Sequence, residues 1–119
     1  MAKVLIVDDS KMSRRMLKSI VEGLEHEIVG EASNGEEGLK IYKETQPDIV
    51  TMDITMPEMD GIACLKAIKE YDSNANVIMV TAAGQSSKLM EALKAGAKEF
   101  ICKPYEPEQV INAIKEVLK

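Results

Sequence analysis

The chain has 119 residues, 45% of them hydrophobic, and a net charge of −5. This length suits about one ordinary domain, and the hydrophobic fraction argues against intrinsic disorder. The negative charge disfavours a nucleic acid partner, because phosphate backbones are bound by basic surfaces. The apolar runs are too short to cross a bilayer, and the first residues show no secretory signal. We therefore expect a cytoplasmic protein without membrane insertion, folded as one domain over residues 1–119.

Five short apolar runs alternate with segments whose hydrophobic residues recur every three or four positions. The runs lie near residues 3–8, 28–32, 48–53, 76–81 and 98–102. They contain few polar residues, which is typical of strands buried on both faces of a parallel sheet. The intervening segments have the periodicity of amphipathic helices, and the first carries Met16, Leu17, Ile20, Val21 and Leu24. The pattern predicts a doubly wound α/β fold of the flavodoxin-like (βα)5 kind, with a five-stranded parallel sheet of order 2-1-3-4-5.

Local signals place several helix ends and some of the core. Asp60 is a predicted N-cap, Pro107 suits a first helical turn, and Gly96 is a predicted C-cap. The methionines Met16 and Met79 are predicted in the core.

The two cysteines, Cys64 and Cys102, are also predicted as small buried hydrophobic residues. Neither has a histidine neighbour in the sequence, which argues against a zinc site. Arg14 and Arg15 are expected on the exposed side of the first helix, either as solvated charges or as part of a docking surface.

Acidic residues follow two of the predicted strands. Asp8 and Asp9 come after the first strand, and Asp53 ends the third. In the order 2-1-3-4-5 these strands are neighbours about 4.8 Å apart. Two carboxylates about 5 Å apart repel by roughly 3 kcal/mol at an effective dielectric constant near 20, so three of them favour a bound cation. Oxygen ligands without cysteine or histidine match Mg²⁺.

Lys103 follows the fifth predicted strand, at the same edge of the sheet. It lies two strand spacings from Asp53, or roughly 10 Å, which only a long side chain bridges. A lysine ammonium is a good partner for phosphate, so the edge combines a cation site, a carboxylate nucleophile and a phosphate-binding group. This combination favours phosphoryl transfer to an aspartate.

Each of these residues also has a purely structural interpretation. Residues 8–10 could cap the first helix, Asp53 could be a loop acid, and Lys103 could be a solvated surface lysine. Thr81 could be an ordinary β-branched strand residue. Four strand ends with matching chemistry favour a functional site over four coincidences.

An ordered set of motifs resembles the receiver domains of two-component response regulators, and the resemblance covers essentially the whole chain. The motifs are Val7-Asp8-Asp9-Ser10, Met52-Asp53 through Met56-Pro57 to Asp60-Gly61, Val80-Thr81-Ala82-Ala83, and Phe100-Ile101-Cys102-Lys103-Pro104. The stretch from Met52 to Gly61 resembles stand-alone chemotaxis regulators of the CheY type in particular. The resemblance implies a signalling switch rather than an enzyme. The only reactions that this switch would catalyse are its own phosphorylation and dephosphorylation.

The resemblance also implies a role for each matching residue around the metal. Asp53 is expected to accept a phosphoryl group from a sensor histidine kinase. Asp9, Asp53 and the backbone carbonyl of Thr55 would ligate Mg²⁺, and Asp8 would act largely through water. Lys103 would neutralise charge on the phosphoryl oxygens.

The implied switch comprises Thr81 and Phe100. The Thr81 hydroxyl would donate to the phosphoryl group and Phe100 would then turn inward, changing the face formed by the fourth helix, fifth strand and fifth helix for a downstream target. The target could be a flagellar motor switch, and the protein is expected to be a monomer. The Lys103-Pro104 peptide is expected to be cis.

Two departures from common patterns in similar proteins concern Phe100 and the pair Thr55 and Ala83. Phe100 stands where many carry tyrosine, so we expect switching to depend on packing without a phenol hydroxyl. Thr55 and Ala83 occupy positions that tune hydrolysis of the phosphoaspartate, and their small side chains should leave an attacking water relatively unhindered.

Other functions fit the same residues less well. An Mg²⁺-dependent phosphatase of the haloacid dehalogenase type also uses an aspartyl phosphate, but Asp53-Ile54-Thr55 resembles its signature only in part. An FMN carrier shares the fold but needs a glycine-bearing phosphate loop, which residues 9–13 lack. A phosphorelay intermediate and a binding module with a vestigial site complete the alternatives.

Overall fold

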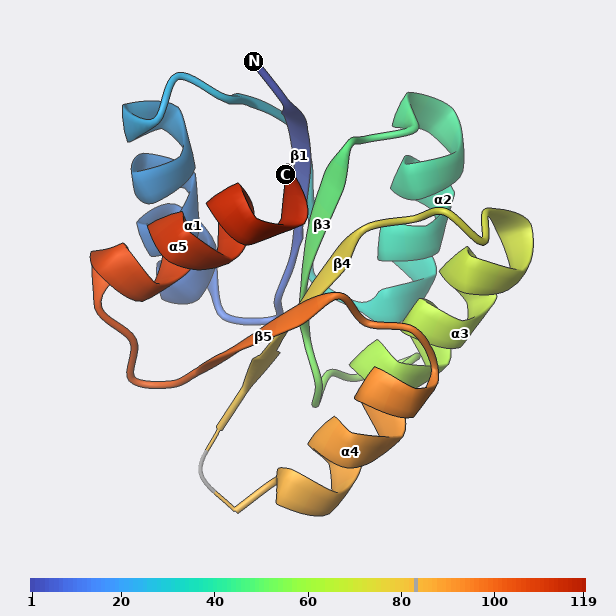
Figure 1. Cartoon of the computed structure of the whole chain (residues 1–119). Helices are drawn as coiled ribbons and strands as arrows, with labels where there is room; N and C mark the ends of the chain where they lie inside the picture. Colours follow the sequence, from blue (N-terminus) through green and yellow to red (C-terminus); the bar gives the residue numbers. More distant parts are fainter. Residues whose placement is uncertain (83) are drawn as a thin grey trace.

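The computed structural model describes residues 1–82 and 84–119, in which five strands alternate with five helices (Figure 1). The strands are β1 (Lys3–Val7), β2 (Glu27–Ala32), β3 (Ile49–Asp53), β4 (Val77–Thr81) and β5 (Glu99–Cys102). The helices are α1 (Lys11–Gly23), α2 (Gly35–Thr45), α3 (Gly61–Tyr71), α4 (Ser86–Lys94) and α5 (Pro107–Val117). All strand pairs are parallel, in the order β2-β1-β3-β4-β5. The predicted fold and strand order are confirmed.

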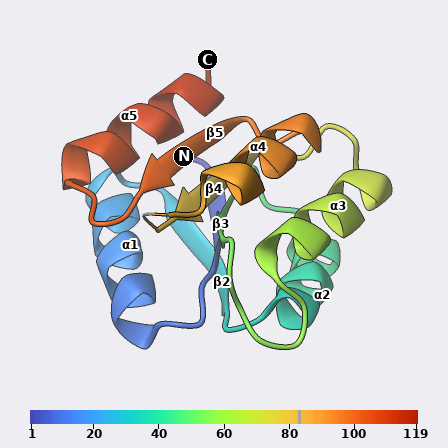
Figure 2. The same ribbon diagram turned by 90° about the horizontal axis from the view of Figure 1, so that it is seen from below.

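Helices cover both faces of the sheet (Figure 2). Helices α1 and α5 pack on one face, where Leu17 and Ile114 meet Val4 and Ile6 of β1. Helices α2, α3 and α4 lie on the other face, whose core includes Leu5 of β1. Successive strand residues point to opposite faces, so β1 contributes to both cores in turn. This explains why the sequence of β1 is apolar throughout.

The edge strand β5 differs from the central strands. Every residue of β3 and β4 is buried, whereas Ile101 is the buried residue of β5. Cys102 is exposed, so the prediction that both cysteines are buried is wrong for Cys102 and confirmed for Cys64. The reason is alternation: Ile101 points into the core under α1 and α5, and its neighbour Cys102 points to the opposite face, outside the core on that side.

The prediction that Met16 lies in the core is also wrong. Met16 is 48% exposed, whereas Met79 is fully buried as predicted. The buried stripe of α1 consists of Ser13, Leu17 and Val21, which recur every four residues. Met16 therefore lies at the margin of this stripe and faces solvent.

The predicted starts of α3 and α5 are confirmed, whereas the C-cap of α4 is Ala95, one residue before the predicted Gly96. Asp60 caps α3 by accepting a hydrogen bond from the Ala63 N–H at 2.9 Å, and Pro107 begins α5. Gly96 follows the C-cap of α4 with a φ angle of +109°. The Lys103-Pro104 peptide is cis, as expected. No helix within residues 1–82 and 84–119 is long and apolar enough to span a membrane.

Both chain ends lie at the end of the sheet where the strands begin (Figure 1). Met1, Ala2 and Lys119 line one shallow hollow there, together with Asp48, which precedes β3. The candidate site lies at the opposite end of the sheet, where the strands terminate.

Candidate functional site

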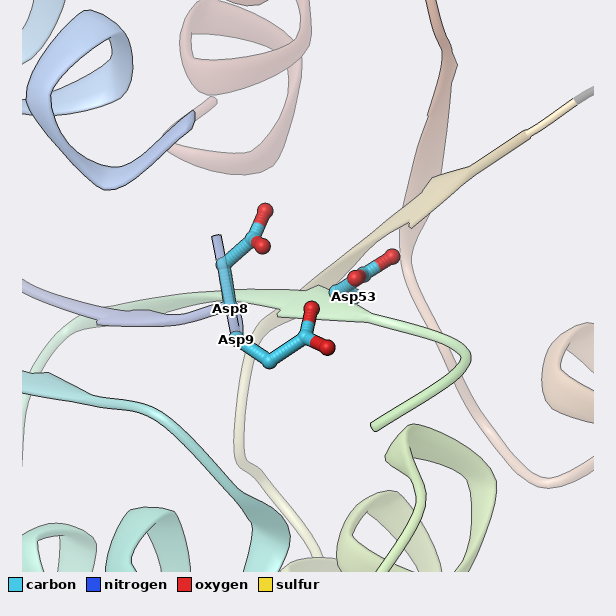
Figure 3. Close-up of side chains that lie close together, drawn as sticks. All are labelled: Asp8, Asp9 and Asp53. Carbon is cyan, nitrogen blue, oxygen red and sulfur yellow. The ribbon is translucent and has the colours of Figure 1, made fainter. Parts of the chain in front are cut away.

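Three carboxylates meet where β1 and β3 end (Figure 3). Val7 of β1 pairs with Met52 of β3, and this register places Asp8 beside Asp53. One carboxylate oxygen from each of Asp8, Asp9 and Asp53 lies within 4.8 Å of the others. Asp8 and Asp53 are buried and Asp9 is exposed, so the cluster has one side open to solvent. The structure therefore brings together the acids predicted from sequence.

Lys103 reaches this cluster from the far side of β4. Its Nζ atom lies 3.3 Å from Asp8 Oδ2 and 3.8 Å from Asp53 Oδ2. Its backbone N–H donates to the Thr81 carbonyl at 2.7 Å, which holds the lysine beside the end of β4. The predicted bridge across the sheet is thus present in the structure.

The electrostatics of the cluster favour a cation. Burial raises the pKa of Asp53 from 3.8 to about 6, repulsion from Asp8 and Asp9 adds to the increase, and Lys103 opposes it. A single ammonium leaves three carboxylates partly uncompensated. The donors are all hard oxygens, which fits Mg²⁺ better than a softer transition metal.

Asp8 is held in place by its neighbours. Its Oδ1 accepts a hydrogen bond from the Ser10 N–H at 2.9 Å, and its backbone carbonyl accepts one from Arg14 at 2.7 Å. Arg14 also lies 3.4 Å from Glu31 at the end of β2. The expectation of a solvated Arg14 is wrong, because this guanidinium ties α1 to the acid cluster; Arg15 is exposed as expected.

The loop after β3 is held by close backbone packing. The Gly61 N–H donates to the Ile54 carbonyl at 2.7 Å, and a Cβ atom on Gly61 would overlap the Asp53 carbonyl oxygen. On the other side of the loop, the Gly35 N–H donates to the Met59 carbonyl at 2.9 Å. These contacts fix the direction in which the chain leaves Asp53.

Thr81 ends β4 and is buried, one strand away from Asp53. Its hydroxyl lies 3.3 Å from the side-chain oxygen of Gln85, and the side-chain nitrogen of Gln85 donates to the hydroxyl of the exposed Thr55. Gln85 belongs to no motif in the sequence and was missed, because its contacts depend on the conformation of two loops. Ala83, the other predicted hydrolysis-tuning position, lies outside the described residues.

Phe100 is 41% exposed on the edge strand. It pairs with Met79, two residues before Thr81, so the two predicted switch residues lie on adjacent strands. The ring is partly exposed and belongs to neither of the two core clusters.

A hollow of about 390 Å³ adjoins the acid cluster on the side of α1. It is lined by Ser10, Met12, Ser13, Met16, Lys103, Pro104 and Tyr105. Met12 is 73% exposed, so this apolar surface is accessible to solvent beside Lys103.

The fold and this site are those of a response regulator receiver domain, and residues 4–115 match that family. The chain therefore belongs to the response regulator receiver domain family. It is 52% identical to the chemotaxis protein CheY of Thermotoga maritima and 50% identical to that of Bacillus subtilis, over at least 97% of each chain.

The solved structures agree with this assignment. A chain in the crystal structure of the CheX–CheY–BeF₃–Mg²⁺ complex of Borrelia burgdorferi is 43% identical, with a TM-score of 0.94 over 98% of this chain and 89% of that one. Within the family, the chain is of the CheY chemotaxis type, a phosphorylation-activated signalling switch, and the phosphatase alternative is not favoured.

Proposed function

We propose that Asp53 is the phosphoryl acceptor of this switch and that Lys103 is its phosphate-binding group. The observation that carries the proposal is the convergence of the Lys103 ammonium and three carboxylates, Asp53 among them, at the carboxyl ends of the strands. Asp9 and Asp53 would hold Mg²⁺ with the Thr55 backbone carbonyl, and Asp8 would contribute largely through water. When bound, the ion supplies positive charge that offsets the carboxylates and the incoming phosphoryl oxygens.

The reaction is a transfer between two proteins. A carboxylate oxygen of Asp53 attacks the phosphorus of a phosphohistidine on a sensor kinase, the N–P bond breaks, and the imidazole leaves with its electron pair and takes up a proton. Lys103 stabilises the charge on the transferring oxygens. Water later hydrolyses the aspartyl phosphate, so the chain catalyses only its own phosphorylation and dephosphorylation.

The response would pass through Thr81 and Phe100. The Thr81 hydroxyl would donate to the phosphoryl group, and Phe100 would turn inward beside β4. The face made by α4, β5 and α5 would then change shape for a downstream target, such as a flagellar motor switch. The small buried area of α4 and β5 supports a movement of this kind.

Partners would use two different surfaces. The apolar hollow at Met12 and Met16 is also lined by Lys103, which contacts Asp53, and it would receive the sensor kinase, whose phosphohistidine must reach the acceptor. The α4–β5–α5 face would serve the downstream target. In this proposal residues 1–119 form one receiver domain, which is monomeric and cytoplasmic. It would act on a downstream target itself rather than pass the phosphoryl group on as a phosphorelay intermediate.

Intact mass after incubation with acetyl phosphate tests the acceptor directly. The native chain should gain one phosphoryl group only with Mg²⁺ present, and Asp53→Asn should gain none. Asp48→Asn is the matched control, because Asp48 precedes the same strand at the opposite edge of the sheet. A gain retained in Asp53→Asn, or no gain in the native chain, would overturn the proposal.

A further inference from the structure

Gln85 lies between the two loops that border the site and has no role in the proposed chemistry. We propose that its side chain is an internal latch: in the unphosphorylated protein it occupies the hydrogen-bond donors of Thr81 and Ala82, which phosphorylation must take from it. The proposal rests on the proposed function, because it concerns the hydroxyl that would receive the phosphoryl group.

The contacts of Gln85 define the latch. Its Oε1 atom lies 2.9 Å from the Ala82 backbone nitrogen and 3.3 Å from Thr81 Oγ1. Its Nε2 atom donates to Thr55 Oγ1 in the loop after β3. One amide group therefore joins the chain after β4 to the chain after β3, across 30 residues of sequence.

Hydrogen-bond chemistry determines the orientation of this amide. The Ala82 N–H can only donate, so the Gln85 atom facing it must be the carbonyl oxygen. The NH₂ group then necessarily faces Thr55, whose hydroxyl oxygen accepts. Because Oε1 also faces Thr81, the Thr81 hydroxyl must act as the donor in that contact.

The Thr81 hydroxyl has a single proton, and this creates the competition. In this structure the Gln85 and Ala82 carbonyl oxygens are its two acceptors, both at 3.3 Å. A phosphoryl oxygen on Asp53 would need the same proton, and hydrogen bonds to charged oxygens are the stronger ones. The phosphoryl group would therefore displace Gln85, which releases the link to Thr55 at the same time.

The position of Gln85 connects the latch to α4. It is the N-cap residue of α4, yet its side chain makes no capping hydrogen bond to that helix in the described part of the chain. The amide instead makes hydrogen bonds to the chain after β4 and to the loop after β3. Displacement of the latch therefore frees the first turn of α4, one of the elements proposed to move.

Two substitutions separate the latch from helix capping. Gln85→Ala removes the latch and leaves α4 without a side-chain cap, as in the native chain. Gln85→Ser also removes the latch, because serine is too short to reach Thr55, but it supplies a good N-cap for α4. Ser87→Ala is the control, since Ser87 is exposed in the first turn of the same helix.

The measurement is the apparent Kd for beryllofluoride in the presence of Mg²⁺, followed by amide NMR, with hydrogen exchange of the Ala82 amide in the absence of ligand. Loss of one neutral competing hydrogen bond should tighten beryllofluoride binding about fivefold in both Gln85 variants. Exchange at Ala82 should accelerate in both, and Ser87→Ala should match the native chain.

Three results would overturn the latch. Native affinity in both Gln85 variants would show that no competition exists. Tighter binding in Gln85→Ser alone would assign the effect to the new N-cap of α4. Absence of beryllofluoride binding by the native chain would overturn the proposed function as well, whereas the first two results leave that function intact.

Discussion

Two parts of the domain, on either side of β4 in the sheet order, are built very differently. The anchored half, which we define as β3 and α3 (residues 49–53 and 61–71), buries every strand residue and the core of its helix at Ile62, Cys64, Leu65 and Ile68. The outer half, which we define as α4 and β5 (residues 86–94 and 99–102), has Ala92 as the buried residue of its helix and Ile101 as that of its strand. Asp53, the proposed acceptor, ends the anchored half, and Phe100 lies in the outer half.

This difference in burial suits the two parts to different tasks: the anchored half to holding the acid cluster, and the outer half to changing conformation. Each fully buried large apolar side chain contributes about 1.5–3 kcal/mol, so displacing the anchored half would cost far more than displacing the outer half. We therefore expect the acids to stay in place while elements with few buried contacts rearrange. This division should be visible when each half is perturbed separately.

The largest effect is expected at Gly61. Gly61→Ala would place a methyl group against the Asp53 carbonyl, so the β3–α3 loop must shift. We expect a loss of about 3 kcal/mol in the free energy of unfolding, measured by urea denaturation, together with loss of phosphorylation. Gly23→Ala is the matched control, because no heavy atom lies within 4 Å of the place its methyl group would take, and it should be stabilising by about 0.5–1 kcal/mol. Equal changes in the free energy of unfolding for Gly61→Ala and Gly23→Ala would contradict the conclusion that the β3–α3 loop is rigidly packed.

Asp53→Asn should stabilise the metal-free protein. The folded-state pKa of Asp53 is about 6, above its ordinary value of 3.8, so the folded state binds the proton more tightly. The native chain therefore loses stability as the pH rises from about 4 to 6, by about 3 kcal/mol in total. Urea denaturation in a chelating buffer should show Asp53→Asn more stable by up to this amount at pH 7.5 and equal to the native chain near pH 3.5.

Added Mg²⁺ supplies the control for the Asp53 prediction. It should stabilise the native chain and narrow the gap to Asp53→Asn. An unchanged gap with and without Mg²⁺ would argue against the carboxylate cluster as the cation site.

Phe100→Ala tests the outer half. Because the ring is 41% exposed, we expect a stability loss of about 1 kcal/mol or less, with phosphorylation at the native rate. The chemical shift changes of α4 and α5 amides on adding beryllofluoride should nevertheless disappear. Met90→Ala, an exposed apolar residue of α4, should keep them. Retention of the shifts in Phe100→Ala would show that this ring is not the switch.

The smallest effect concerns the ion pair that joins the two halves. Lys66 of α3 and Glu91 of α4 lie 2.9 Å apart, and both side chains are more than half exposed. A double-mutant cycle with Lys66→Ala and Glu91→Ala should give a coupling energy of about 0.2–1 kcal/mol that decreases in high salt. A larger coupling would mean that α4 is held to α3 more firmly than its burial indicates.

The sequence predicts the anchored half better than the outer half, for a physical reason. Strands buried on both faces have uninterrupted apolar sequences, and strand order then brings Asp8, Asp53 and Lys103 to one edge. In the outermost strand β5, the exposure of a side chain depends on how far α4 covers the strand. No local sequence pattern indicates this. The error at Cys102 follows from this.

Arg14 and Gln85 escaped sequence analysis because their partners come from distant segments. The Arg14 guanidinium contacts the carbonyl of Asp8 and the carboxylate of Glu31, and the Gln85 amide contacts Thr55. Polar residues on helices and loops look alike in sequence whether they are solvated or engaged. Their roles emerge only when the loops are placed in space.

The location of both chain ends has a practical consequence. Met1 and Lys119 line one hollow at the edge of the sheet opposite Asp53 (Figure 1). A biotin tether or a fused fluorescent protein at either end would therefore lie away from the acid cluster. Immobilised through one terminus on a sensor surface, the molecule would present its proposed phosphorylation site to the solution, where kinases and small phosphodonors can be compared without masking.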